Sequence, residues 1–184
     1  MIKVVTPEEI YFPHRVDEFY FKDENAIRVF LAGTIDDGKS TDWQYSLISN
    51  LLMYNWEEND DRDFDTDFSL GDLIIYSPRR KNWDASANNK EVENQIKWEQ
   101  EHLENADIII MNILPDSKSP ISLLELGLYG PEGKMLVFCT EDFYRFTNVK
   151  LTCERYNIPL IQTNDNDKIA NTIEYIYDEL KEDC

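Results

Sequence analysis

Cysteine and histidine are scarce in this chain, which has three cysteines and two histidines among 184 residues. Cys139, Cys153 and Cys184 show no CxxC spacing, so a disulfide framework or a zinc site has little support. His14 lies in an N-terminal segment and His102 near the end of an expected helix, away from any expected strand end. A Ser-His-Asp or Cys-His mechanism is therefore not expected, and carboxylates must carry any acid or base catalysis.

Basic residues and long apolar runs are also scarce. The chain has 18 Lys and Arg against 37 Asp and Glu, which gives a net charge of −19 and a pI near 4.3. A surface of this average charge repels a phosphate backbone, so we expect no nucleic acid and no anionic membrane as partner. No apolar run reaches the roughly 18 residues of a membrane span, and the N-terminus lacks a signal-peptide layout. These features predict a cytoplasmic protein.

Glycine is too sparse for the common phosphate-binding loops. The loop after the first expected buried strand has glycines at Gly33 and Gly38, which fits neither the GxGxxG dinucleotide fingerprint nor a Walker P-loop. The acidic run at residues 57–68 has aspartates at alternate positions, but Thr66 and Asp72 stand where a calcium loop needs glycine and glutamate. We therefore expect no cofactor and no metal ion.

Apolar runs alternate with helical patterns along the chain. The expected strands lie at residues 26–33, 72–78, 106–113, 134–140 and 158–163. The expected helices lie at residues 43–54, 89–105, 119–130, 141–156 and 165–180. Strands that are apolar on both faces predict a parallel sheet with helices on both sides, which is a doubly wound α/β fold of about five strands. Residues 1–25 do not fit this alternation, so we expect an N-terminal extension that packs outside a single domain at residues 26–184.

In such a sheet, ligands bind at the carboxyl ends of the strands, where the loops after the first four strands meet. The first loop, GTIDDGKSTDW, offers Thr34 and Asp42, and Gly33 lets the backbone approach a ligand closely or simply ends the strand in a turn. The basic cluster SPRRK, residues 77–81, includes Arg79. This cluster either binds a small anion or forms a solvated loop.

Two glutamates fall on helix faces that we expect to point inward. Glu99 lies three residues after Ile96, and Glu125 lies four residues after Ile121, each within an apolar stripe. Burying a lone carboxylate costs several kcal/mol, so each glutamate either lines a polar cavity, forms a structural ion pair or turns out to solvent. Glu125 is the better placed, because it follows a helix N-terminus that favours anions. Two carboxylates suit displacement at the anomeric carbon of a sugar, where one attacks the carbon and an acid protonates the leaving group.

Four segments resemble the nucleoside 2-deoxyribosyltransferase-like family over residues 29–149: VFLAGTID, SPRRKNWDAS, QIKWEQEHLENADIIIMNI and SPISLLELGLYG. The resemblance implies a flavodoxin-like sheet, a homo-oligomer, and transfer of 2-deoxyribose between nucleobases through a covalent sugar–enzyme intermediate. The family's nucleophile falls on Glu125, and its base-recognising aspartate falls on Glu99. Asp84, in the loop after the second expected strand, remains a rival for the acid.

Ser119 stands where the family has a carboxylate six residues before the nucleophile. In the related 2'-deoxynucleoside 5'-monophosphate N-hydrolases a serine at this position looks like a phosphate ligand, and Ser122 lies close by. Ser119 therefore either contacts a 5'-phosphate or caps the helix that begins at Pro120. Trp43 and Trp83 either stack on a base or pack in the core.

The sequence thus predicts a deoxyribosyltransferase-like enzyme that acts on a small nucleoside or nucleotide and a nucleobase. A deoxynucleotide N-glycosidase, in which water replaces the acceptor base, is the close alternative. A non-catalytic nucleotide-binding module on the same fold is the alternative of another class.

Overall fold

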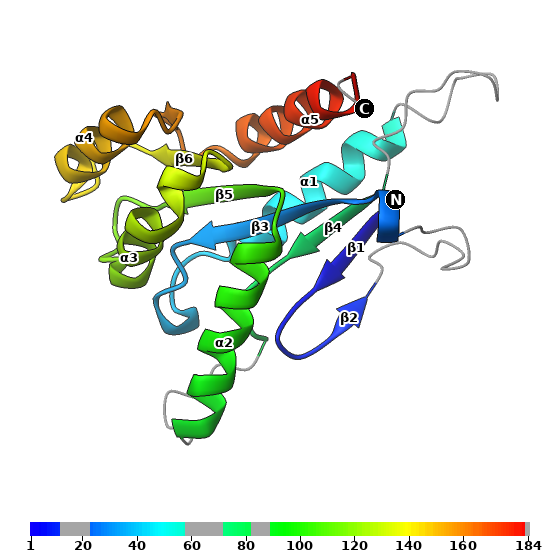
Figure 1. The fold of residues 1–184 in the computed structure, drawn as a ribbon, viewed down its shortest axis with the longest axis horizontal. Coiled ribbons are helices and arrows are strands. Elements are labelled where there is room, and N and C mark those ends of the chain that lie inside the picture. Colours follow the sequence, from blue (N-terminus) through cyan, green and yellow to red (C-terminus); the bar gives the residue numbers. More distant parts are fainter. Residues whose placement is uncertain (12–22, 58–71, 82–88, 183–184) are drawn as a thin grey trace.

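The computed structural model describes residues 1–11, 23–57, 72–81 and 89–182. Within these ranges the sheet has the strand order β2-β1-β4-β3-β5-β6-β7 (Figure 1). The strands are β1 (Ile2–Val5), β2 (Ile10–Tyr11), β3 (Ile27–Gly33), β4 (Leu73–Tyr76), β5 (Ile108–Ile113), β6 (Met135–Cys139) and β7 (Leu160–Ile161). All neighbouring strands are parallel except β1 and β2. The strands from β4 to β7 therefore follow the flavodoxin-like order 2-1-3-4-5.

Helices cover both faces of this sheet, which confirms the doubly wound prediction. The helices are α1 (Trp43–Glu57), α2 (Asn89–Asn105), α3 (Pro120–Tyr129), α4 (Phe146–Tyr156) and α5 (Asn166–Glu182). Helices α1 and α5 lie side by side and form one hydrophobic core with the sheet (Figure 1). Helices α2, α3 and α4 form a second core on the opposite face.

Strand β5 shows why these strands read as unbroken apolar runs. Ile109 and Met111 face the core under α2, α3 and α4, whereas Ile108 and Ile110 face the core under α1 and α5. All six residues of the strand are buried. A strand covered on both faces needs apolar side chains at successive positions. Asn112 is the polar exception, and it lies near the carboxyl end of the strand.

Most predicted elements lie within a few residues of the observed ones. Helix α2 begins and ends at the predicted residues. The helix predicted at residues 141–156 is shorter, because turns precede α4 and the helix begins only at Phe146. Backbone hydrogen bonds from Phe143 to Thr140 (3.1 Å) and from Phe146 to Phe143 (2.9 Å) close these turns.

Residues 1–25 do not all pack outside the sheet, and this expectation was wrong for the first strand. β1 pairs in parallel with β4, from Ile2 opposite Leu73 to Val5 opposite Tyr76, and Val4 is fully buried. β2 then pairs with β1 at the edge. In the part of the chain that the structure describes, the sheet therefore has seven strands rather than about five. A strand of four residues offers too little periodicity to be distinguished from a loop in the sequence.

Gly33 offers a direct test of how closely β3 and β5 are paired. Its φ is 128°, and a Cβ added there would lie 2.1 Å from the carbonyl oxygen of Asn112. We expect Gly33→Ala to lower the free energy of unfolding by more than about 2 kcal/mol, because both the backbone angle and the contact become strained. Urea denaturation monitored by circular dichroism measures this loss.

Gly127 is the matched control for this substitution. A Cβ added at Gly127, inside α3, meets no atom within 4 Å. Because alanine is the better helix former, Gly127→Ala should raise the free energy of unfolding by up to about 1 kcal/mol. Equal effects of the two substitutions would contradict the strained β3–β5 contact.

Candidate active site

The site lies where the winding of the sheet reverses. β3 is followed in the chain by β4 on one side of it, while β5 lies on the other side. In doubly wound sheets, ligands bind outside the carboxyl ends of the strands at such a switch point. Gly33 of β3 and Asn112 of β5 are paired there. The segments that leave these two strands therefore supply the first candidate residues.

Three buried hydroxyl groups meet at this switch point, and we call them the hydroxyl cluster: Thr34, Ser117 and Ser119. The Thr34 Oγ1 atom lies 2.7 Å from Ser119 Oγ and 3.0 Å from Ser117 Oγ, and the two serine oxygens are 2.7 Å apart. The backbone N–H of Leu114 donates to Thr34 Oγ1 at 2.9 Å. The cluster thus joins the loop after β3 to the start of α3.

The hydroxyl cluster has few protons to share. The Ser117 hydroxyl donates to the carbonyl of Leu114 at 2.8 Å. Only the Thr34 and Ser119 hydroxyls then have protons for the three contacts within the cluster. The Ser119 hydroxyl is therefore engaged inside the protein.

Ser119 does not cap α3 with its side chain, so that alternative was wrong. It has a left-handed backbone, with φ of 41° and ψ of 49°, and its hydroxyl makes no capping hydrogen bond. Its carbonyl instead accepts the N–H of Leu123 at 3.0 Å. Pro120 has no N–H, and the N–H groups of Ile121 and Ser122 have no carbonyl within the helix to donate to. The first turn of α3 thus keeps two donors that suit an anion.

Glu125 on α3 and Glu99 on α2 are close enough for the charge of Glu99 to act on Glu125, and we call them the acidic pair. Glu125 is half-buried on α3 and follows the buried Ser122 by three residues. Glu99 is half-buried on α2. Among the described residues, no hydrogen bond or ion pair reaches the carboxyl group of Glu125, whereas that of Glu99 accepts a hydrogen bond from Gln95 at 2.7 Å.

The two members of the acidic pair differ in their affinity for a proton. Burial raises the pKa of Glu125 to about 8, and the negative charge of Glu99 acts in the same direction. Burial also raises the pKa of Glu99, while the hydrogen bond from Gln95 and the charge of Arg80 lower it. At neutral pH, Glu125 therefore holds a proton.

Comparison with known proteins assigns the family. A family model described as nucleoside 2-deoxyribosyltransferase like matches residues 26–143. The chain belongs to this family. The matched residues run from the start of β3 to the turns before α4, so they contain both the hydroxyl cluster and the acidic pair.

Two other comparisons concern curated proteins and solved structures. No curated protein shows a significant match to the chain. Among solved structures, the CMP N-glycosidase BcmB of Clostridium botulinum aligns with 16% sequence identity and a TM-score of 0.42. The alignment covers 81% of this chain and 98% of that one.

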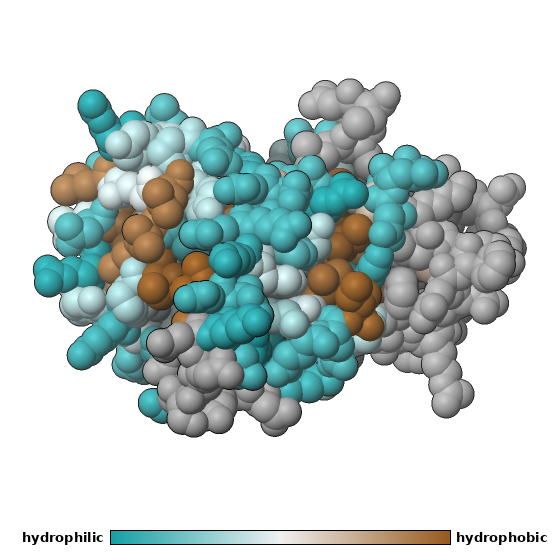
Figure 2. All heavy atoms as spheres, turned by 60° about the horizontal axis from the view of Figure 1, so that its bottom comes forward, coloured by the Kyte–Doolittle hydropathy of each residue, from teal (hydrophilic) through white to brown (hydrophobic). Residues whose placement is uncertain are grey.

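The apolar residues that the sequence suggested as neighbours of the acidic pair do not face inward. Ile121 is more than half exposed, as are Leu124 and Leu128 on the same helix. Ile96 of α2 is nearly half exposed. Apolar side chains accordingly reach the surface in patches between hydrophilic ones (Figure 2). The predicted stripe on α3 was wrong, because its buried face is formed by Ser122, Leu126 and Tyr129. On α2, Leu103 is buried as predicted, whereas Ile96 is not.

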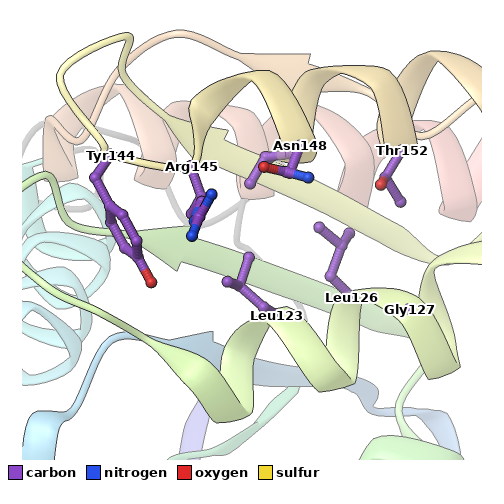
Figure 3. Close-up of a pocket in the computed structure, with 8 residues that line it drawn as sticks. Leu123, Leu126, Gly127, Tyr144, Arg145, Asn148 and Thr152 are labelled. Atoms are coloured by element: carbon purple, nitrogen blue, oxygen red, sulfur yellow. The ribbon is translucent and has the colours of Figure 1, made fainter.

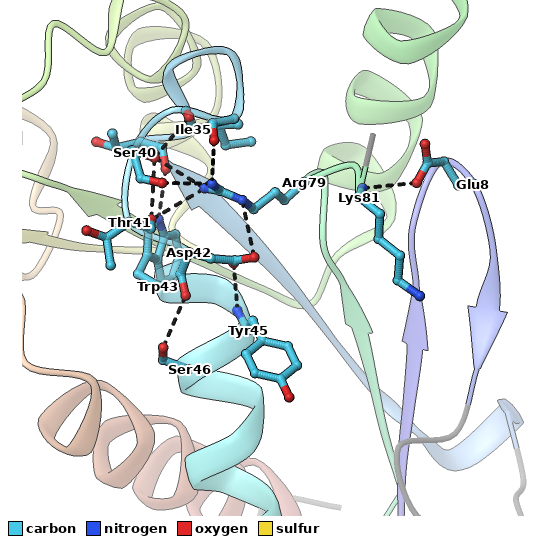
Figure 4. A network of polar contacts seen from close by, with 12 residues as sticks. Glu8, Ile35, Ser40, Thr41, Asp42, Trp43, Tyr45, Ser46, Arg79 and Lys81 are labelled. Carbon is cyan, nitrogen blue, oxygen red and sulfur yellow. Dashed lines mark hydrogen bonds and ion pairs between the residues drawn. The ribbon is translucent and has the colours of Figure 1, made fainter. Parts of the chain in front are cut away.

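Arg79 and Asp42 hold the loop between β3 and α1. The Arg79 guanidinium donates to the carbonyls of Gly38 (3.0 Å) and Ser40 (2.7 Å), and its Nε lies 3.3 Å from Asp42 Oδ2 (Figure 4). Asp42 Oδ1 accepts the N–H of Tyr45 at 3.0 Å in the first turn of α1. The structure gives both residues a role in fixing this loop, and a contact to substrate stays a prediction.

The other cations of the SPRRK cluster also have partners. Arg80 donates through Nε to Gln95, and Lys81 forms an ion pair with Glu9. A hollow of about 80 Å³ lies among these side chains. Ser77 and Pro78 at the start of the cluster are buried. The segment is therefore an interconnected part of the fold, and a solvated loop was the wrong description of its first residues.

Trp43 cannot stack on a base in this structure. Its side chain is 2% exposed in the core under α1 and α5, and its indole N–H donates to the carbonyl of Thr34 at 2.9 Å. Gly33 makes its close backbone contact with Asn112. Asp84 and Trp83 lie outside the described residues, as does His14.

A cavity of about 320 Å³ lies between α3 and α4 (Figure 3). Leu123, Leu126 and Gly127 line it from α3, and Asn148 and Thr152 line it from α4. Neither member of the acidic pair contributes to its walls. The acidic pair of the candidate active site therefore lies outside this cavity.

Across residues 1–11, 23–57, 72–81 and 89–182, no three His, Cys, Asp or Glu side chains are grouped so that they could hold a metal ion. The aspartates at residues 61–67, with their partial likeness to a calcium loop, lie outside these ranges. Over the same part of the chain, none of the helices combines the length and the apolar character needed to cross a membrane.

The raised pKa of Glu125 predicts how stability depends on pH. Between the ordinary value of 4.5 and about 8, the folded protein keeps a proton that the unfolded chain releases, so stability falls as pH rises through this window. Glu125→Gln removes this loss. The unfolding free energy of the variant minus that of wild type should be higher at pH 9 than at pH 4 by on the order of 2–3 kcal/mol. Denaturant titration at both pH values measures this difference.

Glu93→Gln is the control for this measurement, because Glu93 is exposed on α2. Its stability should follow the wild-type pH dependence. If Glu125→Gln gave a curve parallel to that of wild type between pH 4 and 9, Glu125 would not hold its proton in the folded state.

Proposed function

We propose that this chain cleaves the N-glycosidic bond of a 2-deoxyribonucleoside or its 5'-monophosphate, with Glu125 as the nucleophile. The observation that carries the proposal is the isolation of Glu125 from every hydrogen-bond donor and cation among the described residues. A half-buried carboxyl without a partner weakens a fold, so an ion-paired structural role does not account for it. Perturbed carboxyl groups of this kind are typical of catalytic sites.

The acidic pair supplies the two groups that the reaction needs. With one proton between them, the pair exists mainly with the proton on Glu125, and transfer of that proton to Glu99 creates an ionised nucleophile and an acid together. The Glu125 carboxylate then forms a bond to C1' of the sugar while the bond from C1' to the base nitrogen breaks. The acid, Glu99 or its rival Asp84, delivers its proton to the departing base.

The second half of the reaction decides between transferase and hydrolase. In transfer, a nitrogen of a second base attacks C1' of the glycosyl ester, loses its proton to the carboxylate that acted as acid, and releases Glu125. In hydrolysis, water takes the place of the base. Family membership supports both outcomes, and a homo-oligomer remains part of the same proposal.

A panel of deoxynucleosides, ribonucleosides and their monophosphates, each with and without a second base, tests the activity. We expect Glu125→Ala to lower turnover at least about a thousandfold, because it removes the carboxylate proposed to attack C1'. A glycosyl adduct on wild-type Glu125 should appear by intact mass and be lost in the variant. Glu93→Gln should keep wild-type activity.

The outcomes of this panel separate the three functions. An exchanged nucleoside identifies the transferase, and free base with free sugar and no exchanged product identifies the hydrolase. Binding of a nucleoside or nucleotide that survives Glu125→Ala, without turnover of any substrate by wild type, identifies the non-catalytic module and refutes the enzyme.

The start of α3 supports a 5'-phosphate on the substrate. Ser119 and Ser122 lie beside two helix N–H groups that have no partner within the helix, and this combination favours an anion. Engagement of a phosphate by Ser119 requires its hydroxyl to leave Thr34 or Ser117. The carboxyl groups of Glu99 and Glu125 are then available for cleavage of the glycosidic bond.

Ser119→Asp tests the phosphate contact by restoring the family's carboxylate. The added negative charge should repel a phosphate, so kcat/KM for a monophosphate should fall by about a hundredfold relative to that for the nucleoside. Steady-state kinetics with matched nucleoside and monophosphate measure this ratio. An unchanged ratio would place the phosphate, if one is bound, away from α3.

A further inference from the structure

Gln95 connects the acidic pair to the loop after β4, and no pattern in the sequence predicts this connection. It lies on α2, one helical turn before Glu99, and is 5% exposed. Its amide nitrogen donates to the carbonyl of Pro78 at 2.9 Å and to Glu99 Oε1 at 2.7 Å. Its amide oxygen accepts the Nε–H of Arg80 at 2.6 Å. Both amide hydrogens and the oxygen are thus used.

The partners of Gln95 permit only one orientation of its amide. The carbonyl of Pro78 can only accept a hydrogen bond, so it must face the NH₂ group, and the guanidinium of Arg80 can only donate, so it must face the oxygen. The remaining hydrogen of the NH₂ group therefore has to point at Glu99. Glu99 Oε1 consequently always faces a donor.

We propose that Gln95 is a positioning residue of the active site, which fixes the Glu99 carboxyl in one orientation and links it to the Arg80 guanidinium. The part of this role that concerns catalysis rests on the proposed function. The part that concerns the orientation and charge of Glu99 does not depend on any reaction.

This arrangement assigns different tasks to the two oxygens of Glu99. Oε1 is occupied as an acceptor, so a proton taken up by Glu99 resides on Oε2. Oε2 is then the atom that can pass a proton to a leaving base. The charge of Arg80, in the loop after β4, lowers the pKa of Glu99, and the charge of Glu99 raises that of Glu125 on α3.

Gln95 also sets the charge balance of the acidic pair. Its hydrogen bond favours the ionised form of Glu99, and the charge of Glu99 helps to keep the proton on Glu125. Loss of this hydrogen bond should therefore move the proton toward Glu99. A residue that only held α2 against the loop would leave this balance unchanged.

The test compares Gln95→Met with Gln100→Met. Methionine keeps the length of the side chain and removes the amide. Gln100 is exposed on the same helix, and its side chain makes no hydrogen bond to the acidic pair. The readout is the titration of the Glu99 carboxyl in the full chain, followed by NMR with ¹³C-labelled glutamate and assigned with Glu99→Gln. Gln95→Met should raise the pKa of Glu99, whereas Gln100→Met should leave it at the wild-type value.

Arg80→Met provides a second route to the same result, because Arg80 lies in a loop and its loss does not open the core. It should raise the pKa of Glu99 in the same direction. The double variant with Gln95→Met should shift it by less than the sum of the two single shifts, since both act through one chain of contacts. If neither single variant moved the titration of Glu99, the proposal would be refuted.

Kinetics supply the second readout if the panel described above finds a substrate. The kcat of Gln95→Met should fall between about tenfold and a hundredfold, and the alkaline limb of the pH profile of kcat/KM should move to higher pH. A fall in kcat with an unmoved limb would show a purely structural role and overturn the proposal. If wild type turns over nothing, the proposed function fails, while the NMR titration still decides the role of Gln95.

Discussion

The close pairing of β3 and β5 is the constraint on which the rest of the site depends. Gly33 lets the two backbones approach at the carboxyl edge in a way that any side chain would obstruct. This approach places Thr34 next to the segment that follows β5, where it accepts the N–H of Leu114 and meets Ser119. The direction in which α3 leaves the sheet is thereby fixed at its first residues.

The orientation of α3 then determines which groups face one another across the switch point. Its buried face contains Ser122, Leu126 and Tyr129, and Glu125 lies beside this face near Glu99 of α2. Bringing two carboxyl groups together in a partly dry environment opposes folding. The extensive contacts of the sheet and its two cores stabilise the fold and can offset this cost. The acidic pair thus destabilises the protein locally, within a fold that the sheet and its two cores stabilise.

The sequence predicted the strands and helices of the fold better than the contacts between side chains. The parallel core was recognisable because β5 and its neighbours are apolar on both faces, and Glu125 became a candidate through its helix position and the family resemblance. The inward stripe around it was wrong, since Ile121 and Leu128 have the right spacing but lie on the outer side of α3. Periodicity gives the spacing of a helix face, and only tertiary packing decides which face is buried.

The roles of individual polar residues were least predictable. Gln95 and Ser117 gave no signal, because their importance lies in partners that are distant in the sequence, and Trp43 could not be placed between core and site from its type alone. The strand β1 was also missed, because its four residues carry too weak a pattern to be separated from a loop.

The position of β1 has a consequence for the order in which the chain folds during synthesis. Its partner is β4, so Ile2 must wait for Leu73 before it can pair. The apolar residues of β1 therefore lack their partner strand until β4 has been synthesised. Because contacts between distant parts of a chain form slowly, this edge of the sheet should be completed late.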